Sequence, residues 1–320
     1  MQKRIIEFLK KRQEYVSGEE ISKQLGISRQ GLWKHIHELK SIGYDIIAVP
    51  HRGYRLLSCP DRLFPSEVSY QLKTKFLGKK IYYFDNLPST MDIAFEVGIK
   101  GAPEGTLVLA EVQTKGRGRL GRNWFSPKYK GIYLSLLLRP KILTNQTPVF
   151  TLLSAVSVCE AVKEQIGLDI QIKWPNDLLI DNKKLGGILT ELNAEMDEVH
   201  FLVIGIGLNV NNERKSLLEY ATSLKEEKHE QINRIELLKE ILRKIEENYL
   251  IFQKFGAYPI LEKWRDYNIT LGRRVKILSH KGGLEIEGEA VDIDIDGGIL
   301  VRNDLGLIQK VTAGDVVHCR

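Results

Sequence analysis

Three arginines and three glycines alternate within seven residues, from Gly116 to Arg122, and Trp124 follows two positions later. Arginine offers planar forks of N–H donors that match carboxylate and phosphate oxygens, while glycine permits close approaches that a Cβ would block. Between Glu111 and Glu160 the chain has eight lysines and arginines and no acidic residue. This segment therefore predicts a mobile loop that closes over an anionic ligand such as a nucleotide.

The same segment matches the Gly-x-Gly-x-x-Gly fingerprint of dinucleotide-binding folds. That fingerprint works by aiming a helix N-terminus at a pyrophosphate. Here a strand is predicted at 106–113 before the glycines, and an apolar strand-like run at 131–138 follows them. Because the context is strand, loop, strand, the dinucleotide interpretation is disfavoured.

Length and composition place the chain among globular proteins of two or three domains. It has 320 residues, of which 43% are apolar and 28% charged. No apolar run approaches the roughly 20 residues of a membrane span, and no signal sequence is recognisable, so we expect a cytosolic protein with no membrane partner. The three isolated cysteines, Cys59, Cys159 and Cys319, and the seven scattered histidines predict inert thiols and no metal site.

Most of the net charge of +6 lies in the first sixty residues, which hold 11 Lys/Arg and 6 Asp/Glu. We predict a winged helix-turn-helix DNA-binding domain at 1–62, with helices starting after Ser17 and Ser28 and a basic hairpin tip near Arg52. Trp33 is expected in the core. The residues predicted to contact DNA are Arg29, Gln30, Lys34, His37 and Arg52. The alternative is a helical protein-interaction module.

The middle of the chain, 63–270, reads as an α/β domain after a proline-containing linker at 58–65. A first helix is predicted from 65 to about 77. Strands are predicted at 81–84, 106–113, 132–138, 170–174, 178–180, 185–191 and 201–207, and helices at 90–100, 148–166, 233–255 and 260–266. Several strands are joined by short turns, which predicts a mixed or antiparallel sheet and an α+β class.

The last fifty residues, 271–320, alternate in short segments with turns at 281–283 and 296–298, which predicts a small β-barrel. Asp292, Asp294 and Asp296 alternate along one predicted strand. A solvated strand face explains them better than a calcium loop, because the later glutamate of that loop is missing.

Five ordered motifs run through the central domain: Ser89-Thr90, 113–124, Lys173 to Asp177, Lys184 to Leu189, and Gly205 to Asn209. Together they resemble the bacterial biotin protein ligases of the bifunctional type that also repress the biotin operon, and the resemblance covers essentially the whole chain. It implies a class II synthetase-like ligase domain and an SH3-like C-terminal barrel.

The resemblance also implies an activity. The enzyme would activate biotin with ATP and Mg²⁺ to biotinyl-5′-AMP and transfer biotin to one lysine of the biotin carboxyl carrier domain of acetyl-CoA or pyruvate carboxylase. The adenylate would act as corepressor, promoting a homodimer that binds operator DNA. Two alternatives stay open: a ligand-sensing repressor without ligase activity, and a lipoate or octanoate ligase.

The site residues follow from the same resemblance. Because biotin carboxylate and the α-phosphate are both anionic, positioned cations must offset their repulsion; these are Lys184, Arg119 and Arg122. The residues implied to bind biotin are Ser89, Thr90, Met91, Gln113, Gly116, Arg117, Gly118, Arg119, Lys184 and Gly186. Those implied to bind ATP are Arg119, Arg122, Trp124, Asn176, Lys184 and Asn209.

The chain differs from the family at one of these positions and has two adjacent lysines at another. Relatives often carry an amide where this chain has Met91, so only a backbone contact is expected there. Lys183 adjoins Lys184, and strand alternation sends the two side chains to opposite faces, which predicts a solvated Lys183.

Overall fold

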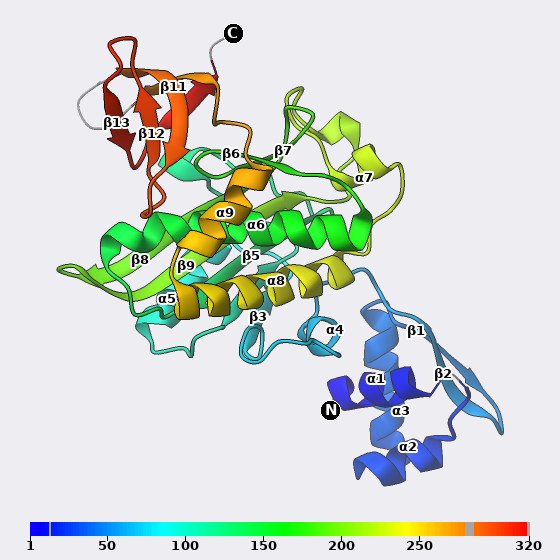
Figure 1. The fold of residues 1–320 in the computed structure, drawn as a ribbon. Helices are drawn as coiled ribbons and strands as arrows, with labels where there is room; N and C mark the ends of the chain where they lie inside the picture. The colour runs from blue at the N-terminus through cyan, green and yellow to red at the C-terminus, as the bar shows by residue number, and fades with distance from the viewer. Residues whose placement is uncertain (13, 279–284, 319–320) are drawn as a thin grey trace. The chain divides into compact units, whose positions relative to one another are not determined.

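The computed structural model describes residues 1–12, 14–278 and 285–318. The chain forms two compact units, Met1–Gln71 and Leu72–Arg320 (Figure 1). Within the described residues, no helix has both the length and the apolar character needed to cross a bilayer.

The first unit is built from helices α1 (Gln2–Lys11), α2 (Gly18–Leu25), α3 (Arg29–Ser41) and α4 (Pro65–Ser69) and from strands β1 (Asp45–Val49) and β2 (Gly53–Ser58). The Ser17 hydroxyl accepts a hydrogen bond from Glu20 N at 3.1 Å, and the Ser28 hydroxyl accepts one from Gly31 N at 3.0 Å. These caps start α2 and α3 where the sequence predicted, because they satisfy N–H groups that the helix leaves unpaired.

The β1–β2 hairpin is held against the segment before α2. Val16 N donates to Tyr54 O at 2.9 Å and Tyr54 N returns a bond to Val16 O at 2.8 Å. Gly53 has φ +100°, and a Cβ there would lie 2.1 Å from Val16 O, so only glycine fits. The Arg52 guanidinium covers the Tyr15 ring at 4.5 Å, which fixes the hairpin tip.

The prediction that Trp33 is a core residue is wrong: the side chain is 62% exposed. Leu32, Ile36 and Leu39 fill the inner side of α3, and one residue further along a helix the side chain points about 100° away. The Trp33 ring instead stacks on His37, with centroids 5.6 Å apart and planes 13° apart.

The second unit contains a seven-stranded sheet of order β3-β4-β5-β9-β8-β7-β6. Its strands are β3 (Ile81–Phe84), β4 (Leu107–Ala110), β5 (Gly131–Leu138), β6 (Gln171–Lys173), β7 (Asp177–Ile180), β8 (Lys183–Glu195) and β9 (Glu198–Asn209). Only the β3–β4 pair among them is parallel. The predicted mixed sheet is confirmed.

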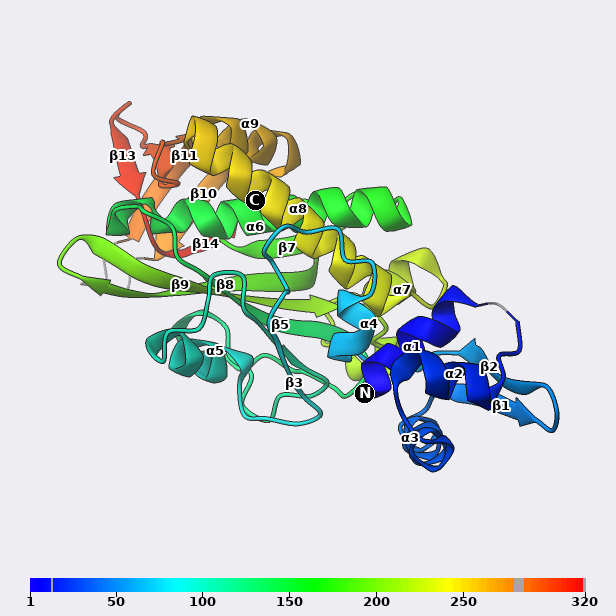
Figure 2. The ribbon, with the colours of Figure 1, turned by 90° about the horizontal axis from the view of Figure 1, so that it is seen from below.

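Helices cover both faces of this sheet, as Figure 2 shows. Helices α6 (Thr147–Ile166), α8 (Arg234–Phe255) and α9 (Tyr258–Tyr267) lie on one face, and α5 (Thr90–Ile99) lies on the other. A short helix, α7 (Leu224–Lys228), was not predicted. Most of α6 is buried because it lies between the sheet and the other two helices.

The predicted helix from 65 to about 77 is too long, because α4 ends at Ser69. The backbone N–H groups of Lys75, Phe76 and Leu77 donate instead to the buried Glu246 carboxylate on α8. A side chain far along the chain thus provides the acceptors that a continued helix would have offered, which no local pattern reveals.

The C-terminal strands β10 (Arg274–Leu278), β11 (Glu285–Ile293), β12 (Ile299–Arg302), β13 (Ile308–Val311) and β14 (Asp315–His318) form an antiparallel sheet of order β13-β12-β11-β10-β14. Closure into an SH3-like barrel stays a prediction. Asp294 and Asp296 both accept from Lys310 at 2.8 Å. The turn predicted at 281–283 and Cys319 lie outside the described residues.

Candidate active site

The arginine-glycine segment between β4 and β5 folds back on itself as a hairpin. Trp124 N donates to Gly116 O and Gly118 N donates to Arg122 O, both at 2.8 Å. The tip turns through Leu120 and Gly121, at φ 58° and φ 70°. Arg117, Arg119, Arg122 and Trp124 of this hairpin line a cavity that residues of the sheet also line, in the segment where the sequence predicted an anion-binding loop. No helix follows it, so the dinucleotide fingerprint has no structural basis here.

A chain of polar side chains lies at the start of α5. Gln113 Oε1 accepts from Thr90 N at 2.8 Å and from Thr90 Oγ1 at 3.0 Å, and Gln113 Nε2 donates to Ser126 Oγ at 3.1 Å. Ser135 Oγ donates to Thr90 Oγ1 at 2.8 Å. Ser89 occupies the N-cap position without a side-chain capping bond, since Gln113 satisfies the helix N-terminus instead.

Two carboxylates hold the Arg117 side chain. Its Nε and Nη2 donate to Glu191 on β8 at 3.1–3.2 Å, and its Nη1 donates to Asp92 on α5 and to Ser89 Oγ at 3.3 Å. Partial burial acts against the charged form, but the bonds and charges of Asp92 and Glu191 raise the pKa of Arg117. The basic segment is therefore neutralised in part by carboxylates outside the interval that the sequence showed to be free of acids.

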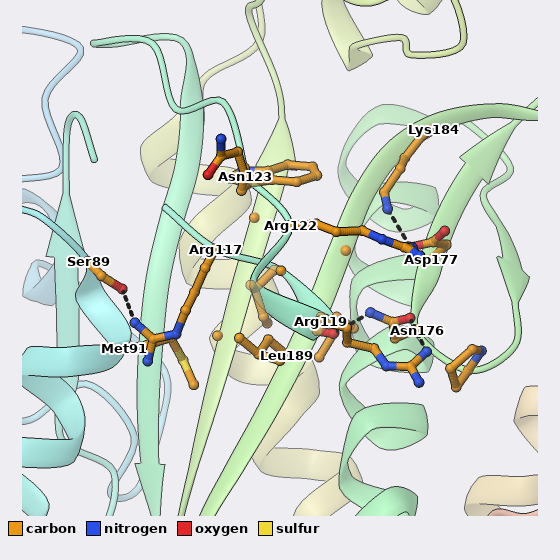
Figure 3. A pocket seen from close by; sticks show the side chains of 18 of the residues that line it. Ser89, Met91, Arg117, Arg119, Arg122, Asn123, Asn176, Asp177, Lys184 and Leu189 are labelled. Carbon is orange, nitrogen blue, oxygen red and sulfur yellow. Dashed lines mark hydrogen bonds and ion pairs between the residues drawn. The ribbon is translucent and has the colours of Figure 1, made fainter. Parts of the chain in front are cut away.

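Arg119 reaches toward the C-terminal sheet. Its Nη1 donates to Gly314 O at 3.1 Å and lies 3.5 Å from Asn176 Oδ1. Asn176 Nδ2 in turn donates to Ile188 O at 2.7 Å, which fixes the amide. In Figure 3 the Arg119 and Asn176 side chains lie together, below Lys184 and Asp177 in that view.

Lys184 and Asp177 form the polar pair at the other end of the site. Lys184 Nζ lies 2.6 Å from Asp177 Oδ1, and Figure 3 shows Arg122 extending toward the same carboxylate. The ammonium is also 5.9 Å from the centre of the Trp124 ring. Lys183 is exposed whereas Lys184 is half-buried, as strand alternation predicted.

The Trp124 indole lies directly over a glycine of β9. A Cβ on Gly207 would fall 2.5 Å from Trp124 Nε1 and 2.6 Å from Cε2. Trp124 Nε1 is buried and has no hydrogen-bond partner among the described residues. A buried donor left unpaired costs about 1–3 kcal/mol, so this N–H fits a site that a ligand acceptor completes.

These side chains line two adjoining cavities of about 210 Å³ and about 950 Å³. The residues that line both are Gln113, Arg122, Asn123, Trp124, Lys173, Asp177 and Lys184. The smaller cavity also has the predicted residues Ser89, Thr90, Met91, Arg117, Gly118, Arg119 and Asn176. The larger one adds Gly116 and Asn209. Lys184 therefore lies where the two cavities adjoin.

Gly186 lines neither cavity. A Cβ there would lie 2.8 Å from Gly207 O, so this glycine serves the close approach of β8 and β9. Met91 is 3% exposed, and its Sδ would lie 2.6 Å from a Cβ on Gly205. The methionine thus forms part of the cavity wall with its side chain, where only a backbone role was expected.

Comparison with known proteins identifies the family. Residues 83–209 match the biotin/lipoate A/B protein ligase family, residues 1–55 match an HTH domain, and residues 270–319 match the biotin protein ligase C-terminal domain. The chain is 41% identical to the bifunctional ligase/repressor BirA of Bacillus subtilis, over 95% of this chain and 94% of that protein. The chain belongs to the bifunctional ligase/repressor family.

Further relatives agree. The BirA of Escherichia coli is 30% identical over 95% of this chain and 92% of that protein. The structure of biotin protein ligase from Aquifex aeolicus in complex with biotin and ATP has 33% identity and a TM-score of 0.65, covering 76% of this chain and 99% of that one. These findings confirm the enzyme class, the biotin and nucleotide ligands and the N-terminal DNA-binding module predicted from the sequence.

Several residues of this ligase/repressor site were not predicted. Asp177 stood within a quoted motif but was not assigned a role, and its contact with Lys184 depends on the β7–β8 register. Asp92 lies two residues after Thr90 of the Ser-Thr motif, whereas nothing in the sequence links Glu191 to Arg117. Leu189 and Gly205 complete the apolar wall of the smaller cavity.

The predicted DNA contacts lie on the first unit. Gln30, Lys34 and His37 are exposed along one side of α3. Arg29 is exposed as well, and its Nη2 lies 2.6 Å from a Glu19 carboxylate oxygen. Contact of these residues with DNA stays a prediction.

Proposed function

We propose that this protein joins biotin to ATP and then transfers biotin to a lysine of a carboxylase carrier domain. The observation that carries the proposal is the position of Lys184, which lines both cavities and has Arg122 and Trp124 beside it. The smaller cavity offers the polar Ser89–Thr90–Gln113 end for the ureido ring and an apolar wall for the rest of biotin. The larger cavity, with Trp124 and Asn209, takes the nucleotide.

In the first step the biotin carboxylate oxygen attacks the α-phosphorus, and the bond to pyrophosphate breaks. Lys184, Arg122 and Arg119 offset the negative charge that gathers on the phosphoryl oxygens. The described residues contain no group of three or more His, Cys, Asp or Glu that could hold a metal ion. Mg²⁺ would be supplied with ATP, whose phosphate oxygens are ligands of the kind that this ion prefers, and would help to neutralise the phosphate charge.

In the second step a lysine amine of the carrier attacks the acyl carbon of biotinyl-5′-AMP, and AMP leaves. The amine must first lose a proton, and the carboxylate lining both cavities beside Lys184 is Asp177. We assign it the role of proton acceptor. The carrier domain of acetyl-CoA or pyruvate carboxylase is the expected partner.

Biotin-dependent exchange of pyrophosphate into ATP tests the first step. The wild-type protein should catalyse exchange with biotin but not with lipoate or octanoate. Lys184→Ala should lower the exchange rate about 10²–10³-fold, the usual loss for one oxyanion donor. Lys183→Ala, which changes the exposed neighbouring lysine, should exchange at close to the wild-type rate. Exchange that survives Lys184→Ala would remove Lys184 from the chemistry, and binding of biotin without exchange would indicate a sensor.

We also propose that the adenylate is a corepressor that promotes homodimerisation and operator binding. The sheet offers a suitable surface, since residues 190–195 of β8 have only β9 as a strand partner in the part of the chain described. Leu192 on this segment is 38% exposed. A strand edge of this kind is open to pairing with a second copy. Sedimentation velocity should show dimers that increase with biotin and MgATP; a mass that ignores both would contradict the corepressor role.

A further inference from the structure

The exposed side of helix α3 carries an aromatic surface that the proposed ligase chemistry does not use. Trp33 is 62% exposed and its indole lies flat against His37, four residues and one turn further along. Indole is among the largest apolar groups that a side chain can bury, and on this helix the buried positions are taken by Leu32, Ile36 and Leu39. The ring is therefore held outward by its place on the helix.

The surroundings of this ring indicate its partner. Gln30, Lys34, His37, Lys40 and Ser41 are exposed at helical spacings around Trp33. The one carboxylate within α3, that of Glu38, is turned to the other side, where it accepts from Gln2 at 2.8 Å and lies 3.1 Å from His35 Nδ1. The aromatic surface is thus flanked by amine, imidazole and amide groups, which complement a polyanion rather than an apolar protein groove.

DNA presents one apolar group on its base edges in the major groove, the C5 methyl of thymine. Trp33 is the fifth residue of α3, within the N-terminal half that a recognition helix turns toward base edges. An indole backed by a stacked imidazole offers a flat, rigid apolar face of the right kind for that methyl. We propose that Trp33, supported by His37, reads a thymine methyl in each half-site of the operator. This inference rests on the proposed repressor function.

The effects of Lys34 and Lys40 on DNA binding can be separated experimentally from those of the Trp33–His37 pair. A lysine near a phosphate contributes the same affinity to every sequence and raises the salt dependence of binding. A methyl contact is apolar, so it contributes to one base pair only and leaves the salt dependence unchanged. The contribution of one buried methyl corresponds to about fourfold in affinity.

The experiment uses the full chain with biotin and MgATP, and DNA that the wild-type protein selects from a random-sequence pool. Each thymine of the selected duplex is replaced in turn by deoxyuridine, which removes only the methyl group. We expect one thymine per half-site whose replacement weakens wild-type binding about fourfold. Trp33→Ala should bind the thymine duplex about tenfold or more weakly and should no longer distinguish thymine from deoxyuridine there.

Two variants complete the test. Trp33→Phe should keep part of the thymine preference. Lys34→Ala should keep all of it, and because one phosphate contact is lost, the slope of log K against log salt should become smaller in magnitude by about one. Pyrophosphate exchange and thermal unfolding of Trp33→Ala should match wild type, because Trp33 is exposed and belongs to neither cavity. If Trp33→Ala binds selected DNA as tightly as wild type, or keeps the same thymine preference, the inference is overturned while repression stands. If wild-type protein selects no DNA, the repressor proposal itself fails.

Discussion

An ion pair with no exposed side-chain surface joins the chain just after β4 to the start of α8. Arg234 Nη1 at the start of α8 donates to Glu111 Oε2 and to Gly131 O, both at 2.9 Å, and both side chains are 0% exposed. Tyr83 OH also donates to Glu111 Oε1, at 3.3 Å. Glu111 stands two residues before Gln113, so this pair fixes the start of the loop that carries the site.

Removing one partner of such a pair leaves the other charge buried and without its counter-charge. Arg234→Met and Glu111→Leu should therefore each cost about 3–5 kcal/mol in the free energy of unfolding. The double variant removes both charges of the pair, and the losses among the contacts given above are the donor to Gly131 O and the acceptor for Tyr83 OH. These neutral groups should cost about 1–3 kcal/mol in total. The double variant should thus be more stable than either single one.

Urea unfolding, followed by the fluorescence of buried Trp174 and Trp264, measures these differences. Glu96→Gln provides the control, because its pair with Lys100 has side chains 55% and 69% exposed and should change stability by less than about 1 kcal/mol. Single variants that cost no more than this control would refute the reasoning, and so would a double variant whose cost equals the sum of the two.

Two further predictions concern a glycine and a thiol. Gly207→Ala should displace the Trp124 indole and weaken the apparent affinity for ATP in the exchange assay at least about tenfold. The new Cβ of Gly205→Ala meets mainly the flexible Met91 side chain, so this variant should retain the wild-type affinity for ATP. Equal losses of ATP affinity in the two variants would contradict this account. Burial, followed by the charge of Glu67, raises the pKa of Cys59 to about 11 from 9.0. Alkylation of Cys59 at pH 8, followed by peptide mass spectrometry, should be about 100-fold slower than for an ordinary thiol. Because the folded pKa is the higher one, the protonated thiol stabilises the fold below pH 9, and this contribution is lost as the pH rises toward 11; alkylation at the ordinary rate would contradict the shift.

The sequence motifs predicted which residues gather at the site, but they did not predict which carboxylates pair with its cations. Ser89 precedes α5, Gln113 and Trp124 lie in the connection between β4 and β5, and Lys184 lies on β8; the sheet brings these segments to one cavity, and the ordered motifs had grouped the four residues. The partners of the cations were not predictable, since Glu191 meets Arg117 across 74 residues. A run of sequence without acids shows only that no neighbour along the chain neutralises it.

Two predictions about the fold were wrong because local sequence preferences did not decide the outcome. The segment after Ser69 has helix-forming residues, yet its N–H groups bind the Glu246 carboxylate. Trp33 illustrates the opposite case, in which a strong preference of the residue type for the core gave way to helix geometry. In the first case the deciding group is a carboxylate on another helix, and in the second it is the side of the helix that faces the core.

The carboxylates that hold the site cations bear on how the site works. Lys184 with Asp177, and Arg117 with Asp92 and Glu191, are fixed in place before any phosphate arrives. An unpaired lysine would sample many rotamers and would lose that freedom on binding ATP. In the pair, the ammonium is already positioned, and an incoming α-phosphate needs only to share it with Asp177. Sharing the ammonium with the phosphate also leaves the Asp177 carboxylate beside the new acyl phosphate, where the carrier amine must lose its proton. One ion pair thus serves both proposed half-reactions, and Asp177→Asn should slow transfer to the carrier more than it slows pyrophosphate exchange; equal losses in the two assays would assign Asp177 to holding Lys184 alone.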